Sequence, residues 1–402
     1  MSIVIALLGL GLLIFVHESG HFFASLAVGL RPRRFYLGFP PPLVKVRRKG
    51  IDYGIGTIPL GGFVSIPGMH RPIPHDAERR FSRAVAEAPG LAGPVERVKW
   101  ALAGDDLQAC LPALDGLEEA MRDRKLSPAA TTSAEKGFTE LRDALGPDAY
   151  WKAATWRRLV AIGAGPAANI ALAIALMTAL FMTSAGKATS TVASVNDNSP
   201  AQAAGLRPGD RVVAIDGLRV GASGIADRIT GSNGQKLVVT VARGGQQIRL
   251  TPVVAKPIDG VYRLGFVLRG RALGPLEAFG QSFRVTGLVT VEIGRSLGRL
   301  ATGGGRKDVS SPIGITRASS DAVQQGTASY LWVLALISLS IALLNLLPLL
   351  PLDGGHILFT LIEGARGRFV KREIYERVSA VGLAVVLLLF FIGLTNDIGR
   401  LS

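Results

Sequence analysis

Val16-His17-Glu18-Ser19-Gly20-His21-Phe22 lies inside the first apolar segment of the chain. On an α-helix, residues four positions apart share a face, so the imidazoles of His17 and His21 can bind one Zn²⁺ together. Glu18 follows the first histidine and can reach the open side of the metal, where it is placed to take a proton from water that the metal makes acidic. The stretch therefore predicts a helical zinc site with Glu18 as its acid–base group.

The segment around this motif is long and apolar enough to cross a membrane. Residues 3–16 carry no charge, and the apolar run resumes at Phe22 and continues to Leu30. At about 1.5 Å per residue, such a helix spans a hydrocarbon core of about 30 Å. Ionisable residues at that depth are costly and usually mark a functional site. The alternative, a polar helix end among lipid headgroups, does not explain the histidine spacing.

The apolar residues of this 402-residue chain gather in blocks instead of spreading evenly. The blocks are residues 3–30, 159–182, 331–350 and 378–394. Each approaches or exceeds the length of a membrane span, which predicts a polytopic α-helical membrane protein with about four transmembrane helices. The first block lacks a basic n-region and carries the histidine motif, so we do not expect it to be a cleaved signal peptide.

The net charge of +15 does not indicate nucleic-acid binding, because the chain has no aromatic-rich basic module. We interpret the positions of the basic residues as a signal of membrane topology instead. Two connections beside the apolar blocks are basic: Arg31, Arg33, Arg34, Lys45, Arg47, Arg48, Lys49, Lys152, Arg157 and Arg158 lie in one, and Arg366, Arg368, Lys371, Arg372 and Arg377 in the other. The positive-inside bias places both connections in the cytosol, and residues 185–328 and the two termini on the outer side. The lone Cys110 excludes an intrachain disulfide.

The expected organisation follows from these blocks and from turn signals between them. We expect transmembrane helix 1 over 1–30, a re-entrant β-hairpin region over 31–70, a cytosolic helical insertion over 71–152, transmembrane helix 2 over 153–185, a PDZ domain over 186–270, an interfacial amphipathic segment over 271–328, transmembrane helix 3 over 329–356, and a cytosolic loop with transmembrane helix 4 over 357–402. In the insertion we expect short helices at 76–88, 94–108 and 133–145.

Two connecting regions have recognisable β patterns. Residues 43–47 and 53–58 flank a glycine turn and predict a hairpin, which 59–66 extend. Because the hairpin is apolar, it can enter the membrane if protein or substrate covers its edges. The alternative is a surface hairpin without a role. Residues 199–217 resemble the core signature of a PDZ domain, which binds extended peptides by strand addition. Peptide binding and simple steric obstruction are both open for this domain.

The third apolar block ends in Asn345-Leu346-Leu347-Pro348-Leu349-Leu350-Pro351-Leu352-Asp353-Gly354-Gly355-His356, where a helix cannot continue unbroken. Broken backbone at membrane depth persists only where protein or a water-filled cavity satisfies it. Asp353 is therefore expected to face the site as the third zinc ligand. Zn²⁺, two neutral imidazoles, one carboxylate and one hydroxide sum to zero charge, which a low-dielectric interior tolerates. A helix cap without a metal role, or His356 as a substitute ligand, is the alternative.

Taken together, the motifs at 17–21 and 345–355, with the PDZ-like segment between them, resemble the site-2 protease family of intramembrane zinc metalloproteases, of the bacterial regulator of sigma-E protease type. The likeness includes Gly165-Pro166 with Asn169, residues 58–64 and residues 311–315. On the residues alone, Asn169 is expected to hydrogen-bond to a neighbouring helix, in a structural or a catalytic role.

The resemblance implies cleavage of single-pass membrane proteins in or near their transmembrane segment, with anti-sigma factors or remnant signal peptides as substrates, in the bacterial inner membrane. It implies that His17, His21 and Asp353 hold Zn²⁺, that Glu18 acts as general base and acid, and that Asn345 contacts the substrate backbone. The active site is then expected toward the cytoplasmic side. A catalytically silent PDZ-bearing scaffold and a metal transporter are the rival interpretations.

Overall fold

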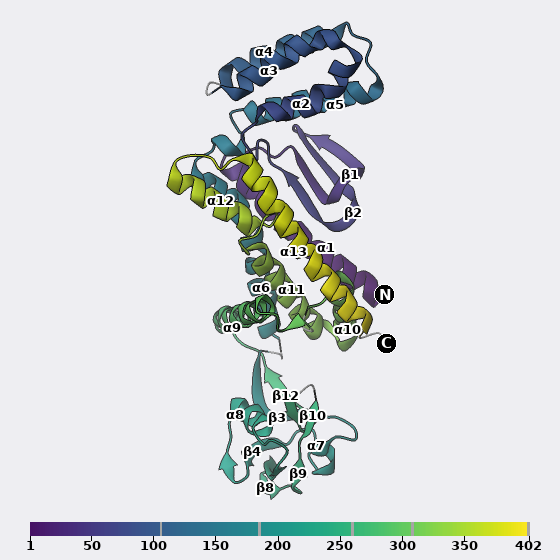
Figure 1. Cartoon of the computed structure of the whole chain (residues 1–402). Helices are drawn as coiled ribbons and strands as arrows, with labels where there is room; N and C mark the ends of the chain where they lie inside the picture. Colours follow the sequence, from purple (N-terminus) through teal and green to yellow (C-terminus); the bar gives the residue numbers. More distant parts are fainter. Residues whose placement is uncertain (105–106, 184–185, 259–260, 307–308, 400–402) are drawn as a thin grey trace. The chain divides into compact units, whose positions relative to one another are not determined.

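The computed structural model describes residues 1–104, 107–183, 186–258, 261–306 and 309–399 (Figure 1). Within these ranges, four helices are long and apolar enough to cross a membrane. They are α1 (Ser2–Ala27), α6 (Thr155–Phe181), α11 (Thr327–Asn345) and α13 (Arg372–Gly399). The predicted polytopic helical architecture is confirmed.

The chain divides into two compact units. The first contains residues 1–172, 293–324 and 337–402, and the second contains residues 173–292 and 325–336. Each unit has its own buried core, so each is described by itself.

In the first unit, two long bent strands follow α1. They are β1 (Arg34–Arg48) and β2 (Ile51–Ser65). Residues 34–37 pair on one side with 52–55 and on the other with 62–65, while 44–48 pair with 51–55. The two strands thus form an antiparallel sheet in which residues 62–65 are an edge segment. The predicted run at 43–47 was too short, because Gly38 and the prolines at 40–42 bend β1 without ending it. The predicted runs at 53–58 and 59–66 together correspond to β2.

A helical insertion follows the sheet. It consists of α2 (Pro74–Glu87), α3 (Ala92–Ala103), α4 (Cys110–Arg122) and α5 (Pro128–Leu145), with 3₁₀ turns at Pro89–Leu91, Leu107–Ala109 and Tyr150–Lys152. Its core includes the fully buried side chains of Phe81, Leu91, Leu114 and Leu117. Helix α4 was not predicted, although Leu114 and Leu117 on it fill this core.

The remaining helices of this unit are tied to the long ones by buried carboxylates. They are α10 (Pro312–Gln325) and α12 (Asp353–Arg366). Near the end of α13, Asp397 accepts hydrogen bonds from the backbone amides of Ser311 (2.7 Å) and Gly314 (3.1 Å), which caps α10. On α12, Glu363 pairs with Arg158 of α6, with 2.6 Å between Oε2 and Nη1, and also accepts from the Val370 amide.

We expect Glu363→Ala to destabilise the protein strongly. Arg158 and Glu363 are 5% and 7% exposed, so the substitution leaves a buried guanidinium without its partner, at a cost of about 3–5 kcal/mol. Thermal unfolding in detergent, followed by tryptophan fluorescence, measures the effect. Glu96→Ala is the control. Glu96 pairs with Lys99 on an exposed helix surface, and such a pair contributes only about 0–1 kcal/mol to the free energy of unfolding. Equal losses in the two variants would contradict the expected importance of the buried pair.

The second unit contains a β-rich domain. Its elements are β3 (Lys187–Val195), α7 (Pro200–Ala203), β4 (Arg211–Ile215), β5 (Leu218–Arg219), α8 (Ala222–Thr230), β6 (Lys236–Leu237), β7 (Val239–Arg243), β8 (Gln246–Arg249), β9 (Val253–Val254), β10 (Lys256–Ile258), β11 (Val261–Arg263) and β12 (Phe266–Arg271). The main sheet has the antiparallel order β12-β3-β4-β7-β8. The buried centre of the domain includes Val192, Ile215, Ile225 and Val241. This arrangement agrees with the predicted PDZ-like domain, and α9 (Pro275–Ala301) follows it.

Asp210 is expected to make the PDZ-like domain acid-sensitive. The Arg243 guanidinium, 2.7 Å away at two of its nitrogens, and the Arg207 backbone amide hold the pKa of Asp210 below its usual range. Because the charged form is the stabilised one, its contribution is complete above about pH 3.9 and is lost as the pH falls through the lower folded-state value.

Asp210→Asn should remove this dependence and cost about 1.5–3 kcal/mol at neutral pH. Amide hydrogen exchange of β4 and β7 in the full protein, corrected for the intrinsic effect of pH, measures both changes. Wild-type protection in the variant at neutral pH would contradict the prediction.

Candidate active site

Three potential metal ligands converge in the first unit. His17 and His21 lie one turn apart on α1, and Asp353 is the first residue of α12. Asp353 Oδ2 lies 3.2 Å from His17 Nε2 and 3.3 Å from His21 Nε2, and the two Nε2 atoms are 3.3 Å apart. Both histidines are 7% exposed. The three residues are the one such group of potential ligands found among the described residues.

The spacing of these atoms fits a zinc ion. A tetrahedral zinc with bonds of about 2.0–2.1 Å separates its ligand atoms by about 3.3–3.4 Å. The Asp353 Oδ2 atom is buried and has no hydrogen-bond partner within the described parts of the chain. An uncompensated buried carboxylate oxygen is costly, whereas a cation between it and the two imidazoles satisfies it. The position of Asp353 is therefore better explained by a metal ligand than by a helix cap without a metal role.

Helix α6 fixes the orientation of His21. The Nδ1 atom of His21 lies 3.0 Å from the carbonyl oxygen of Ala161 on this helix. Because a carbonyl can only accept, Nδ1 carries the proton and Nε2 presents its lone pair to the cluster. The contact needs a residue without a side chain at Gly165, because a Cβ there would overlap the His21 imidazole. Gly165 thus allows α6 to pack directly against a candidate metal ligand.

Glu18 lies beside the edge of the β-sheet. A Cβ on Gly62 would collide with the Glu18 side chain, so this carboxyl group lies directly against the backbone of β2. Residues 62–65 pair with residues 33–37 on one side, and no further strand pairs with their other side within the described residues. An edge segment of the sheet therefore lies directly beside the Glu18 carboxyl group.

The other predicted residues contact groups other than the three ligand side chains. Asn345 ends α11, and its Nδ2 donates to the Ile341 carbonyl (3.0 Å) of the same helix. His356 is outside the group of converging ligand atoms, and its ring centroid lies 6.4 Å from that of Tyr375. Asn169 is fully buried and contacts α11 through its backbone carbonyl, which accepts from Ser338 Oγ (2.8 Å). Its side-chain amide has no partner among the described residues, so the expected side-chain hydrogen bond is not seen.

Two features of the site were not assigned by sequence reasoning. Gly62 and Gly165 belong to quoted glycine stretches, but a sequence does not show which side chain a glycine faces. The Ala161 carbonyl has no sequence signature, because every residue carries one. Gly165 lies four residues after Ala161 in the same apolar helix, and this glycine was the one sequence signal for close packing at that point.

Comparison with known proteins identifies the family. The profile of peptidase family M50 matches residues 5–389. A protein described as a zinc metalloprotease in Agrobacterium fabrum is 30% identical, over 98% of this chain and 95% of that protein. One described in the same way in Rhizobium meliloti is also 30% identical, over the same shares. The zinc metalloprotease RasP of Bacillus licheniformis is 27% identical over the full length of both chains. The chain therefore belongs to peptidase family M50 and is a multi-pass membrane zinc metalloprotease.

Proposed function

We propose that His17, His21 and Asp353 hold the zinc ion and that Glu18 is the general base and acid of peptide hydrolysis. The supporting observation is the convergence of three buried ligand atoms, 3.2 to 3.3 Å apart. Zinc in such a site makes water acidic and polarises a carbonyl. Glu18 takes up the proton of the attacking water and delivers it to the leaving amine. Two neutral imidazoles and one carboxylate leave a single positive charge on the loaded site.

We infer that the substrate binds as an extended strand along residues 62–65. This segment is a sheet edge beside Glu18, and edges of this kind accept a further strand. Peptide carbonyls in a helical substrate are hydrogen-bonded within the helix, so extension must precede attack by water. The sheet then re-enters the membrane, where protein and substrate satisfy its backbone groups. Asn345 is proposed to contact the substrate backbone through its amide oxygen.

The substrate class follows from the membrane location. We propose that the enzyme cleaves single-pass membrane proteins, such as anti-sigma factors or remnant signal peptides, in or near the transmembrane segment. The basic connections beside the spans support a cytoplasmic active site and an outer PDZ-like domain in a bacterial inner membrane. This domain either binds an extended peptide or obstructs bulky substrates.

Metal removal tests the proposal. Purified protein in detergent is incubated with a single-pass substrate, before and after treatment with 1,10-phenanthroline and removal of the chelator. We expect cleavage to fall below detection and to return when one equivalent of Zn²⁺ is added, because the ligand cluster has room for one ion. Magnesium, which prefers oxygen ligands, is the control ion and should not restore activity. Full activity in metal-free protein would contradict the proposal.

A further inference from the structure

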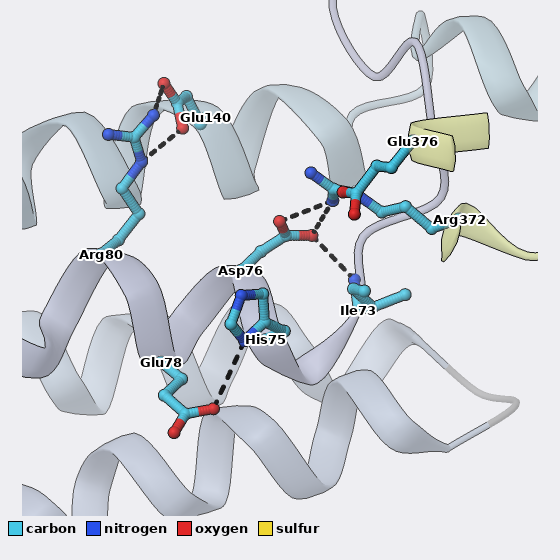
Figure 2. A network of polar contacts seen from close by, with 8 residues as sticks. All are labelled: Ile73, His75, Asp76, Glu78, Arg80, Glu140, Arg372 and Glu376. Carbon is cyan, nitrogen blue, oxygen red and sulfur yellow. Dashed lines mark hydrogen bonds and ion pairs between the residues drawn. The ribbon is translucent and has the colours of Figure 1, made fainter. Parts of the chain in front are cut away.

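One carboxylate joins the helical insertion to the last long helix. Figure 2 shows Arg372, at the start of α13, reaching Asp76 of α2. Arg372 Nη1 lies 2.6 and 2.7 Å from the two Asp76 oxygens, and Asp76 Oδ2 accepts the Ile73 amide at 3.0 Å. The Asp76 and Arg372 side chains are 13% and 23% exposed. The Arg80–Glu140 pair in the same figure, by contrast, links two helices inside the insertion.

Helix α13 packs directly on the loop that leads to Asp353. A Cβ on Gly382 would overlap the carbonyl oxygen of Leu350, so backbone meets backbone there. One turn into α13, the Tyr375 ring lies 4.3 Å from that of Phe359 of α12, centroid to centroid. Leu350, Phe359 and Tyr375 form one buried cluster. The N-terminal half of α13 therefore touches both the loop before Asp353, at Gly382, and the helix that Asp353 begins, at Tyr375.

The loop is also confined from the α12 side. A Cβ on Gly354 would collide with the carbonyl oxygens of Leu346 and Leu347, and a Cβ on Gly355 would meet the backbone of residues 349 and 350. Close packing on both sides transmits displacements instead of absorbing them. A shift of α13 would therefore move the loop, and Asp353 with it. Ligand distances in metal sites lie within about 0.2 Å of their standard values, so a displaced carboxylate binds the ion less well.

We propose that Asp76 and Arg372 are positioning residues: their ion pair holds the start of α13 and, through Tyr375 and Gly382, keeps Asp353 in place opposite His17 and His21. This inference rests on the proposed zinc site. It gives the insertion a role in the reaction, because displacing the insertion from α13 would loosen a metal ligand. The PDZ-like domain takes no part in this path.

Zinc affinity of the full-length protein tests the inference, measured by competition with a chromogenic chelator. We expect Asp76→Asn to weaken zinc binding by about 10–100-fold, the range for residues that orient metal ligands, and to lower kcat more than it raises KM. Arg372→Lys keeps the charge that faces Asp76 but loses the Nε–H that donates to Glu376 at 3.0 Å, so its effect should be smaller. The charge-reversed pair Asp76→Arg with Arg372→Asp should recover part of the affinity. Glu140→Gln, which breaks the Arg80 pair, should bind zinc as the wild type does.

The outcomes separate this inference from the zinc proposal. Wild-type zinc affinity and kcat in Asp76→Asn, while Asp353→Ala loses zinc, overturn the positioning role and leave the zinc site standing. Equal losses in Asp76→Asn and Glu140→Gln also overturn it, because they indicate general destabilisation of the insertion. Retention of zinc by Asp353→Ala overturns the zinc site itself.

Discussion

Glu18→Gln is expected to abolish peptide cleavage while the zinc content stays at the wild-type level. The amide has nearly the same shape as the carboxylate but cannot accept a proton from water, and loss of a positioned acid–base group costs about 10²–10⁴-fold in rate. Co-expression with a single-pass membrane substrate, followed by detection of the truncated product, measures the loss. Metal analysis of the purified variant measures the retained zinc.

Ser19→Ala is the matched control for this experiment. Ser19 is the next residue on α1, and its hydroxyl donates to the Phe15 carbonyl of the same helix at 2.6 Å. Its removal should leave cleavage unchanged. A catalytically silent scaffold would tolerate both substitutions equally, so unaltered substrate processing by Glu18→Gln would remove the assignment of Glu18 as the base.

The position of the site in the chain was predictable because each half has a local cause. A histidine spacing of four is a helical repeat, and it places His17 and His21 on one face whatever packs around them. Pro348 and Pro351 each lack a backbone N–H, so a break between Asn345 and Asp353 was expected. Helix α11 ends at Asn345 and α12 begins at Asp353. That the two halves meet was predicted from the broken backbone at membrane depth and from charge compensation.

Local patterns failed where tertiary packing decided the outcome. Helix α4 contains Pro112 and Gly116, which both argued for a break. Pro112 lies in the first turn, where its missing N–H would have no partner in the helix, and burial of Leu114 and Leu117 offsets the glycine. The prediction for β1 was too short for a similar reason, because a proline-containing run does not show with which segments it pairs.

Contacts made by the backbone were beyond prediction from the sequence. The Ala161 carbonyl that orients His21, and the approach of Gly62 to Glu18, depend on how α6 and β2 lie against α1. The Asp76–Arg372 pair joins residues 296 positions apart, and nothing in the local sequence distinguishes it from the exposed pairs of the insertion. Such long-range contacts are decided by the fold as a whole.

Asp353→Ala is expected to lose both zinc and proteolysis, and it separates the proposed ligand set from its nearest alternative. Removing the carboxylate leaves two imidazoles and an uncompensated dication in a largely buried site. Zinc affinity should therefore fall by more than the roughly 10–100-fold that loss of a residue hydrogen-bonded to a metal ligand costs. Chelator competition on the full-length protein measures this affinity. Asp353→Cys, which replaces one anionic ligand by another, should recover zinc binding in part.

His356→Ala provides the comparison that decides between the two candidate third ligands. His356 lies three residues further along α12, outside the group of converging ligand atoms. If Asp353 is the ligand, the His356 variant keeps its zinc and the Asp353 variant does not. The reverse result would require the start of α12 to turn so that His356 replaces Asp353 beside His17 and His21. The tight packing of Gly354 and Gly355 against residues 346–350 opposes that rotation, because any turn of α12 drives its backbone into the preceding loop.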